Sequence, residues 1–302
     1  MKKQVRTVTE GAMMLAIVGV FLYVNRLSGA MLDGILAFAM PLPAIFYIAK
    51  YGIKQGLILS FAMALLGLIL ANPISLFYVM TAIVVGLVYG YGIHRDKDNG
   101  WLLIWTTIMT AISFFIEMVL LAKMFGYDFN TEVSTLITTL KEMGVTSMPD
   151  NIETLIISIY PMAMLMAAFA QALITHIFAI ILLKRLKIKT RSMKPLSLII
   201  LPRKFAYVLS LGLFTNLFLT LTNDITIQII LTNFATFSMM MFCIDAYIFV
   251  LMFSKLVHKP WLSLLAVLVF LMMPFIGVSI GLFDSFTDLR KRVLYTYAKP
   301  AE

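Results

Sequence analysis

Four polar side chains stand inside long apolar runs, where a charged or hydrogen-bonding group is costly to place. They are Glu117, Gln171, His176 and Asp245. An ionisable side chain at bilayer depth costs about 2.5 to 3.5 kcal/mol on insertion scales, so each of these groups needs a partner or a function. Two interpretations remain open. The four residues line a polar ligand-binding pocket or ion path, or each bonds a neighbouring helix for packing.

Helical geometry gives these residues approximate depths. At 1.5 Å per residue, Asp245 lies roughly 15 Å and His176 about 12 Å from the cytoplasmic ends of their runs. Glu117 and Gln171 lie about 24 Å and about 20 Å from the same face. The sequence therefore predicts two pairs of candidate ligand-binding residues at matched depths.

Signatures of enzymes and metal sites are missing from the sequence. It contains no Gly-x-x-x-x-Gly-Lys loop, no His-Glu-x-x-His and no Gly-x-Ser-x-Gly. The three histidines lie far apart, and the single cysteine, Cys243, stands in an apolar run. We expect no enzymatic activity, no catalytic residue, no cofactor and no bound metal.

The composition places the whole chain in a lipid bilayer. Of 302 residues, 61% are hydrophobic and 13% charged, against roughly 45–50% and about 25% in soluble domains. Because lipid cannot satisfy bare backbone groups, we predict an all-α polytopic membrane bundle. About nine spans are expected, at residues 7–24, 30–49, 55–71, 74–93, 101–122, 155–183, 205–221, 225–254 and 261–283.

Basic residues predict the orientation of these spans. The net charge of +9 comes from Lys and Arg in short connections, which favours a plasma-membrane protein with a cytoplasmic N-terminus and lipid neighbours, and no nucleic-acid partner. The tail with Arg290 is the exception, because it falls outside if residues 261–283 cross once. A re-entrant hairpin broken at Pro274 would return it to the cytoplasm.

Two of the segments that connect the predicted spans are long and have a distinctive charge. Residues 184–204 are rich in Lys and Arg and divide a six-helix unit, residues 1–190, from a C-terminal extension, residues 191–302. Two interpretations of this basic segment stay open: its charges fix the membrane topology, or they bind anionic lipid. Residues 125–154 are acidic and carry apolar side chains at helical spacing, which predicts an outer amphipathic helix, either a lid or a surface helix.

The first span carries a small-residue patch. Ala12 and Ala16 lie one turn apart and form a smooth surface on which another helix can dock.

The order of short motifs resembles the YybS-like family of uncharacterised bacterial membrane proteins. The matching stretches are Thr9-Glu10-Gly11-Ala12, Met40-Pro41-Leu42-Pro43, Tyr51-Gly52-Ile53-Lys54-Gln55-Gly56 and the closing motif at residues 281–292.

The first six predicted helices also resemble the S-components of energy-coupling-factor transporters. In those proteins an Ala-x-x-x-Ala patch on the first helix docks on a coupling subunit driven by paired ATPases, and Ala12 and Ala16 match that pattern. The substrate lies near the outer face, where residues 125–154 take the place of a covering loop. The resemblance implies a small-molecule-binding or transport-related subunit that works with a coupling subunit and ATPases in trans.

A second function class stays open beside this one. The chain would then be a non-transporting scaffold or regulatory protein in cell-envelope processes, recruiting partners through residues 184–204 or the tail near Arg290.

Overall fold

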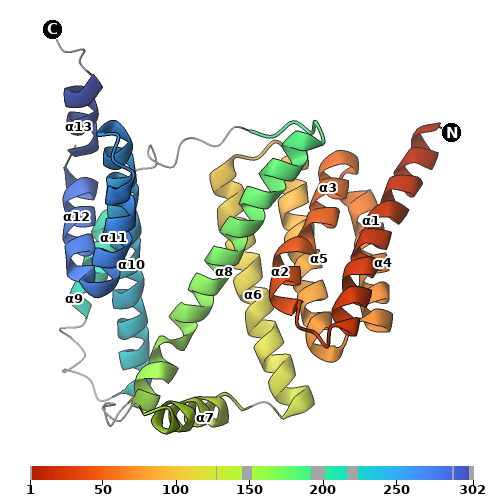
Figure 1. Cartoon of the computed structure of the whole chain (residues 1–302), viewed down its shortest axis with the longest axis horizontal. Coiled ribbons are helices and arrows are strands. Elements are labelled where there is room, and N and C mark those ends of the chain that lie inside the picture. Colours follow the sequence, from red (N-terminus) through yellow and green to blue (C-terminus); the bar gives the residue numbers. More distant parts are fainter. Residues whose placement is uncertain are drawn as a thin grey trace. The chain divides into compact units, whose positions relative to one another are not determined.

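The chain folds into helices. The computed structural model describes residues 2–126, 128–144, 152–191, 201–215, 224–287 and 289–298, and within them it contains thirteen helices and no strand (Figure 1). Seven helical segments are long and apolar enough to cross a membrane, or eight if one bent pair counts as a span. The predicted all-α membrane bundle is confirmed. Parts of the acidic segment, the basic segment and the run at 205–221 lie outside the described residues.

The expected count was about nine spans, and the residues that the structure describes contain seven or eight by this criterion. In the run at 205–221, the structure has α9 (Arg203–Phe214), a helix of 12 residues. A transmembrane helix needs about 20 residues to cross the hydrocarbon core. Residues 216–221 of this run lie outside the described residues, so the span expected here stays a prediction.

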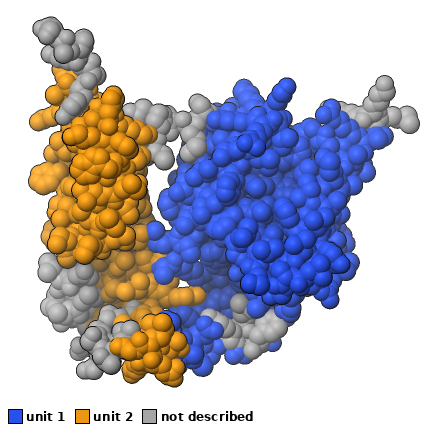
Figure 2. Space-filling model, viewed as in Figure 1, with its two compact units in different colours: residues 1–136, 163–192 blue, residues 137–162, 193–302 orange. Residues whose placement is uncertain are grey.

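The chain forms two compact units (Figure 2). Unit 1 comprises residues 1–136 and 163–192, and unit 2 comprises residues 137–162 and 193–302. The sequence-based division at residues 190 and 191 stays a prediction.

Unit 1 contains α1 to α6. Their bounds are α1 (Lys2–Leu27), α2 (Asp33–Ala39), α3 (Pro41–Tyr51), α4 (Ile53–Leu70), α5 (Pro73–His94) and α6 (Asn99–Phe125). Local chemistry sets several of these ends. Asn72 caps α5 by accepting from the Ser75 amide at 2.6 Å, and Asp98 caps α6 by accepting from the Trp101 amide at 3.2 Å. Gly52, with φ of +86°, makes the sharp break between α3 and α4.

Close packing of α3 on α5 forms the centre of unit 1. Gly86 and Gly90 of α5 face α3, and a Cβ added at Gly86 would stand 2.5 Å from the Ala44 Cβ. One added at Gly90 would stand 2.7 Å from the Ile48 Cβ. Ala44 and Ile48 are fully buried. These glycines therefore serve the close helix approach expected of a Gly-x-x-x-Gly pair.

Two helices have residues in both units. They are α7 (Phe129–Glu142) and α8 (Ile152–Arg185). The predicted amphipathic helix is present as α7, with Val133 and Ile137 buried and Gly144 at a φ of +91° beyond its end. At its start, hydrogen bonds from the Thr131 hydroxyl and the Asn130 amide hold the pKa of Asp128 below its usual range.

An exposed ion pair lies beyond the end of α8, within unit 1. Arg191 donates to both carboxylate oxygens of Asp96 at 3.3 Å, and this contact holds the pKa of Asp96 below its usual range. Exposed pairs of this kind add little stability.

Unit 2 is built on one long helix. It contains α9, α10 (Ile225–Leu256), α11 (Trp261–Met272), α12 (Pro274–Phe286) and α13 (Leu289–Ala298). Between α11 and α12 the chain bends by 116° at the break before Pro274. The predicted break is present, and Figure 1 shows α13 beside the C-terminal end of α10. Such a bend belongs to a broken span or a re-entrant loop, not to a straight crossing.

Gly86 offers a direct test of the α3–α5 contact. Because Ala44 has no flexible side chain that can move aside, Gly86→Ala forces the two backbones apart. We expect a loss of about 1–3 kcal/mol in unfolding free energy, measured by thermal unfolding in detergent. Gly34→Ala is the control, since a Cβ there meets nothing within 4 Å. Equal stability of the two variants would contradict this account of the packing.

Candidate functional site: an apolar cavity with a single carboxyl group

A cavity of about 400 Å³ lies between α5 and α6. It occupies the half of the helix pair farther from the turn at residues 95–98, because its lining runs from Val84 to Pro73 on α5 and from Ser113 to Met124 on α6. We call it the Glu117 cavity. Its lining residues are Pro73, Leu76, Phe77, Met80, Thr81, Val84, Ser113, Ile116, Glu117, Leu120 and Met124.

Glu117 is the only ionisable residue in this lining. Its side chain is half-buried, and no described residue donates a hydrogen bond to its carboxyl group. The Ser113 hydroxyl is already engaged with the Met109 carbonyl of its own helix at 2.9 Å. The cavity thus offers apolar walls and one unpartnered carboxyl group, which suits a molecule with an apolar body and a single polar or cationic end.

A polar cluster lies at the same end of α5. The Asn25 amide donates to Asp33 at 2.7 Å and to Ser75 at 3.0 Å, and the Ser75 hydroxyl donates to Asp33 at 2.6 Å. Asn25 and Ser75 are buried. This cluster ties the ends of α1 and α2 to the first turn of α5, next to the cavity residues Pro73 and Leu76, and therefore fixes the wall of the cavity.

Gln171 and His176 lie elsewhere in unit 1 and are both buried. The Gln171 amide donates to the Ala37 carbonyl at 3.4 Å. His176 Nδ1 is hydrogen-bonded to the Tyr89 hydroxyl at 2.7 Å, and His176 Nε2 has no partner among the described residues. Neither residue lines the Glu117 cavity. Their ligand-binding role stays a prediction.

Asp245 belongs to unit 2 and lies in a buried ion cluster. Arg290 Nη2 donates to the Asp245 carboxylate at 2.7 Å and to its backbone carbonyl at 2.9 Å, while Arg290 Nε donates to Asp284. The Ser285 hydroxyl donates to Asp245 at 3.2 Å. All four residues are at most 4% exposed. Ion pairs and hydrogen bonds of this cluster link α10, α12 and α13.

Arg290 corrects an expectation from the sequence. We expected it in an accessible basic tail able to recruit partners, but its side chain is 2% exposed and bound to two carboxylates. Its neighbour Arg292 is exposed. Arg290 therefore holds α13 in place, and the recruitment of partners by the tail around it stays a prediction. Asp284 was also missed, although an acid within the apolar residues 274–286 is the same signal that singled out Asp245.

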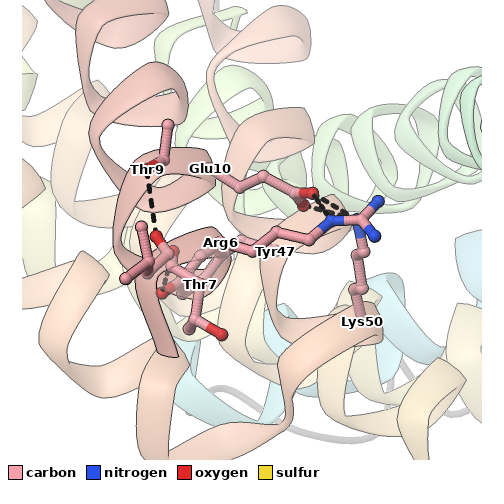
Figure 3. Close-up of polar contacts among 7 residues, drawn as sticks. Arg6, Thr7, Thr9, Glu10, Tyr47 and Lys50 are labelled. Carbon is pink, nitrogen blue, oxygen red and sulfur yellow. Dashed lines mark hydrogen bonds and ion pairs between the residues drawn. The ribbon is translucent and has the colours of Figure 1, made fainter. Parts of the chain in front are cut away.

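A further ion cluster joins the start of α1 to the end of α3 (Figure 3). The Glu10 carboxylate accepts from Lys50 at 2.7 and 2.5 Å and from Arg6 at 2.9 Å. The Tyr47 hydroxyl donates to the Thr7 carbonyl at 3.3 Å. Gly11 follows Glu10 on α1, and a Cβ added at Gly11 would stand 3.1 Å from the Tyr47 hydroxyl. Glu10 and Gly11 together let α1 pack closely on α3.

Ala12 and Ala16 are both exposed and lie on α1 opposite its buried residues Met14 and Val18. Large apolar side chains beside them, including Met13 and Ile17, are exposed as well. Within unit 1, α1 packs on α3 and α4 with its other face. The patch is therefore open in the isolated chain, and its docking role stays a prediction.

Arg290 allows a test of the buried cluster. Arg290→Gln leaves two buried carboxyl groups without their cation, so we expect a loss of about 3–5 kcal/mol in unfolding free energy. Arg292→Gln removes the same charge from an exposed position and serves as the control. Thermal and denaturant unfolding in detergent measure both. If the two variants lose equal stability, the cluster does not hold α13 as described.

One family model matches the chain. The model described as "Predicted membrane protein (DUF2232)" matches residues 13–285, which include the Glu117 cavity, Asp245 and Asp284. No curated protein and no solved structure matches the chain with significant similarity. The apolar helices long enough to span a bilayer agree with that description. The chain is thus an integral membrane protein that belongs to the DUF2232 family.

Proposed function

We propose that this protein is the ligand-binding subunit of a membrane assembly and that its ligand is a small amphipathic molecule with one positively charged group. The observation that carries the proposal is the unpartnered carboxyl group of Glu117 in an otherwise apolar cavity of about 400 Å³. A volume of this size lies within the range of small-molecule sites.

The charge of the ligand follows from the surroundings of Glu117. A carboxylate at membrane depth without a partner is unfavourable, and the described residues provide none. A cationic group on the ligand would form a charge-assisted hydrogen bond with it, which contributes about 1.5–3 kcal/mol. The apolar body of the ligand would pack against Phe77, Met80 and Ile116.

The open patch on α1 supports the role of a subunit. With a cytoplasmic N-terminus in the plasma membrane, Ala12 and Ala16 would lie in the inner half of the bilayer. A coupling subunit with ATPases would dock there, as the sequence-based resemblance to S-components implies. The same topology puts the Glu117 cavity in the outer half, where a ligand from outside would enter. Cavity and patch then serve uptake together.

Ligand charge and side-chain charge are tested in one set of measurements. We expect wild type to bind dodecylamine more tightly than dodecanol, and Glu117→Gln to weaken only dodecylamine binding, by about tenfold to a hundredfold. Native mass spectrometry or calorimetry in detergent measures this. Glu132→Gln, at an exposed acid of α7, is the matched control. Equal binding of both probes by wild type and Glu117→Gln would overturn the proposed ligand class.

Docking of a coupling subunit on the α1 patch is tested by replacing its alanines with larger side chains. In a gentle-detergent pull-down, Ala12→Leu plus Ala16→Leu fills the patch and is expected to lose a coupling subunit and ATPases that wild type retains. Met13→Leu plus Ile17→Leu alters the neighbouring positions without adding bulk and should retain them. If wild type brings down envelope or regulatory proteins without an ATPase, and the patch variant retains them equally, the scaffold function replaces the transport-related one.

A further inference from the structure

We propose that Asp245, Asp284 and Arg290 form a proton-binding site inside unit 2, with the proton held on the Asp284 carboxyl group. This inference concerns a different part of the chain from the Glu117 cavity and is independent of the proposed ligand.

The charges of the buried cluster balance only if one of its two acids is protonated. The cluster contains two carboxyl groups and one guanidinium group, and Arg is always protonated in proteins. All three side chains are nearly excluded from solvent. Their exposed fractions are 2% for Arg290, 4% for Asp245 and 0% for Asp284. If both acids were ionised, the buried cluster would carry a net charge of −1. An uncompensated buried charge is strongly unfavourable, and a bound proton removes it.

Hydrogen bonding selects which acid holds the proton. Both oxygens of the Asp245 carboxylate accept, one from Arg290 and one from Ser285, so Asp245 has the contacts of an ionised group. Asp284 accepts only through Oδ2, from Arg290. Its Oδ1 is buried and has no partner among the described residues. Protonation of that oxygen removes the negative charge that the missing donor leaves uncompensated.

The described acids and bases that face one another in the cluster come from α10, α12 and α13. The facing groups are Asp245 from α10, Asp284 and Ser285 from α12, and Arg290 from α13. From α9, Ala206 and Leu209 are buried in the apolar core with Phe242, and the ring of Tyr207 lies 4.9 Å from that of Phe286. Arg292 lines a separate hollow with Phe249 and Phe283. The proton is therefore assigned to the Asp–Arg–Asp group.

The bound proton links helix packing to pH. The cluster ties α12 and α13 to the middle of α10, and loss of the proton would leave repulsion between two carboxylates that share one cation. Raising the pH would then loosen α12 and α13 from α10, whereas lowering it would keep them together. The α11–α12 hairpin is the element that this change would release.

Infrared spectroscopy of the full chain counts the proton directly. Protein labelled with ¹³C-aspartate is expected to show, near neutral pH, the carbonyl band of one protonated aspartic acid per chain. The label separates this band from glutamic acids, including Glu117. Asp284→Asn removes the band. Asp245→Asn removes it too, because the remaining carboxylate is then balanced by Arg290. Asp128→Asn, at an exposed residue just before α7, leaves it unchanged.

Two results would overturn the inference. One is a wild-type spectrum without a protonated aspartic acid near neutral pH, a measurement that needs no variant to fold. The other is a band that persists in both Asp284→Asn and Asp245→Asn. Binding of dodecylamine to the Glu117 cavity is read in a separate assay, so failure of either proposal leaves the other testable.

Discussion

Lipid offers no hydrogen bonds, so every polar group within the spans must find its partner inside the protein. This constraint accounts for the contacts that hold the helices together. Glu10 and Lys50 join α1 to α3, Tyr89 and His176 join α5 to α8, and Arg290 joins α13 to α10 and α12. Each contact uses groups that water would otherwise solvate, and each therefore specifies which helices are neighbours.

Some buried polar atoms lack such a partner among the described residues, including His176 Nε2 and Asp284 Oδ1. Glu117 also lacks one, and it lines a cavity. Its carboxyl group lies in an apolar cavity and receives no hydrogen bond from the described residues. In unit 2 an excess carboxyl group has the same need for a positive charge, but there the surroundings are closed and packed around Arg290. The open cavity suits a ligand, whereas the closed cluster suits a proton. One physical requirement thus leads to two different sites.

The sequence predicted the features that depend on composition and local spacing. Apolar runs indicated the spans, and Pro274 marked the bend between α11 and α12. Pairings between distant residues could not be predicted from the sequence. Glu10 and Lys50, for example, lie 40 positions apart and meet only because their helices pack together. Arg290 was misassigned because basic residues after an apolar run normally mark a connection in water. Glu117 was identified, but its separation from Gln171 depends on the tertiary arrangement.

The central claim is that the Glu117 cavity is a ligand site, and an experimental structure of the full chain in nanodiscs of native lipids tests it most directly. The account predicts an elongated density between α5 and α6 whose polar end meets the Glu117 carboxyl group. A cavity filled by the side chains of Phe77, Met80 and Leu120, or occupied by an acyl chain with no polar end at Glu117, would contradict it.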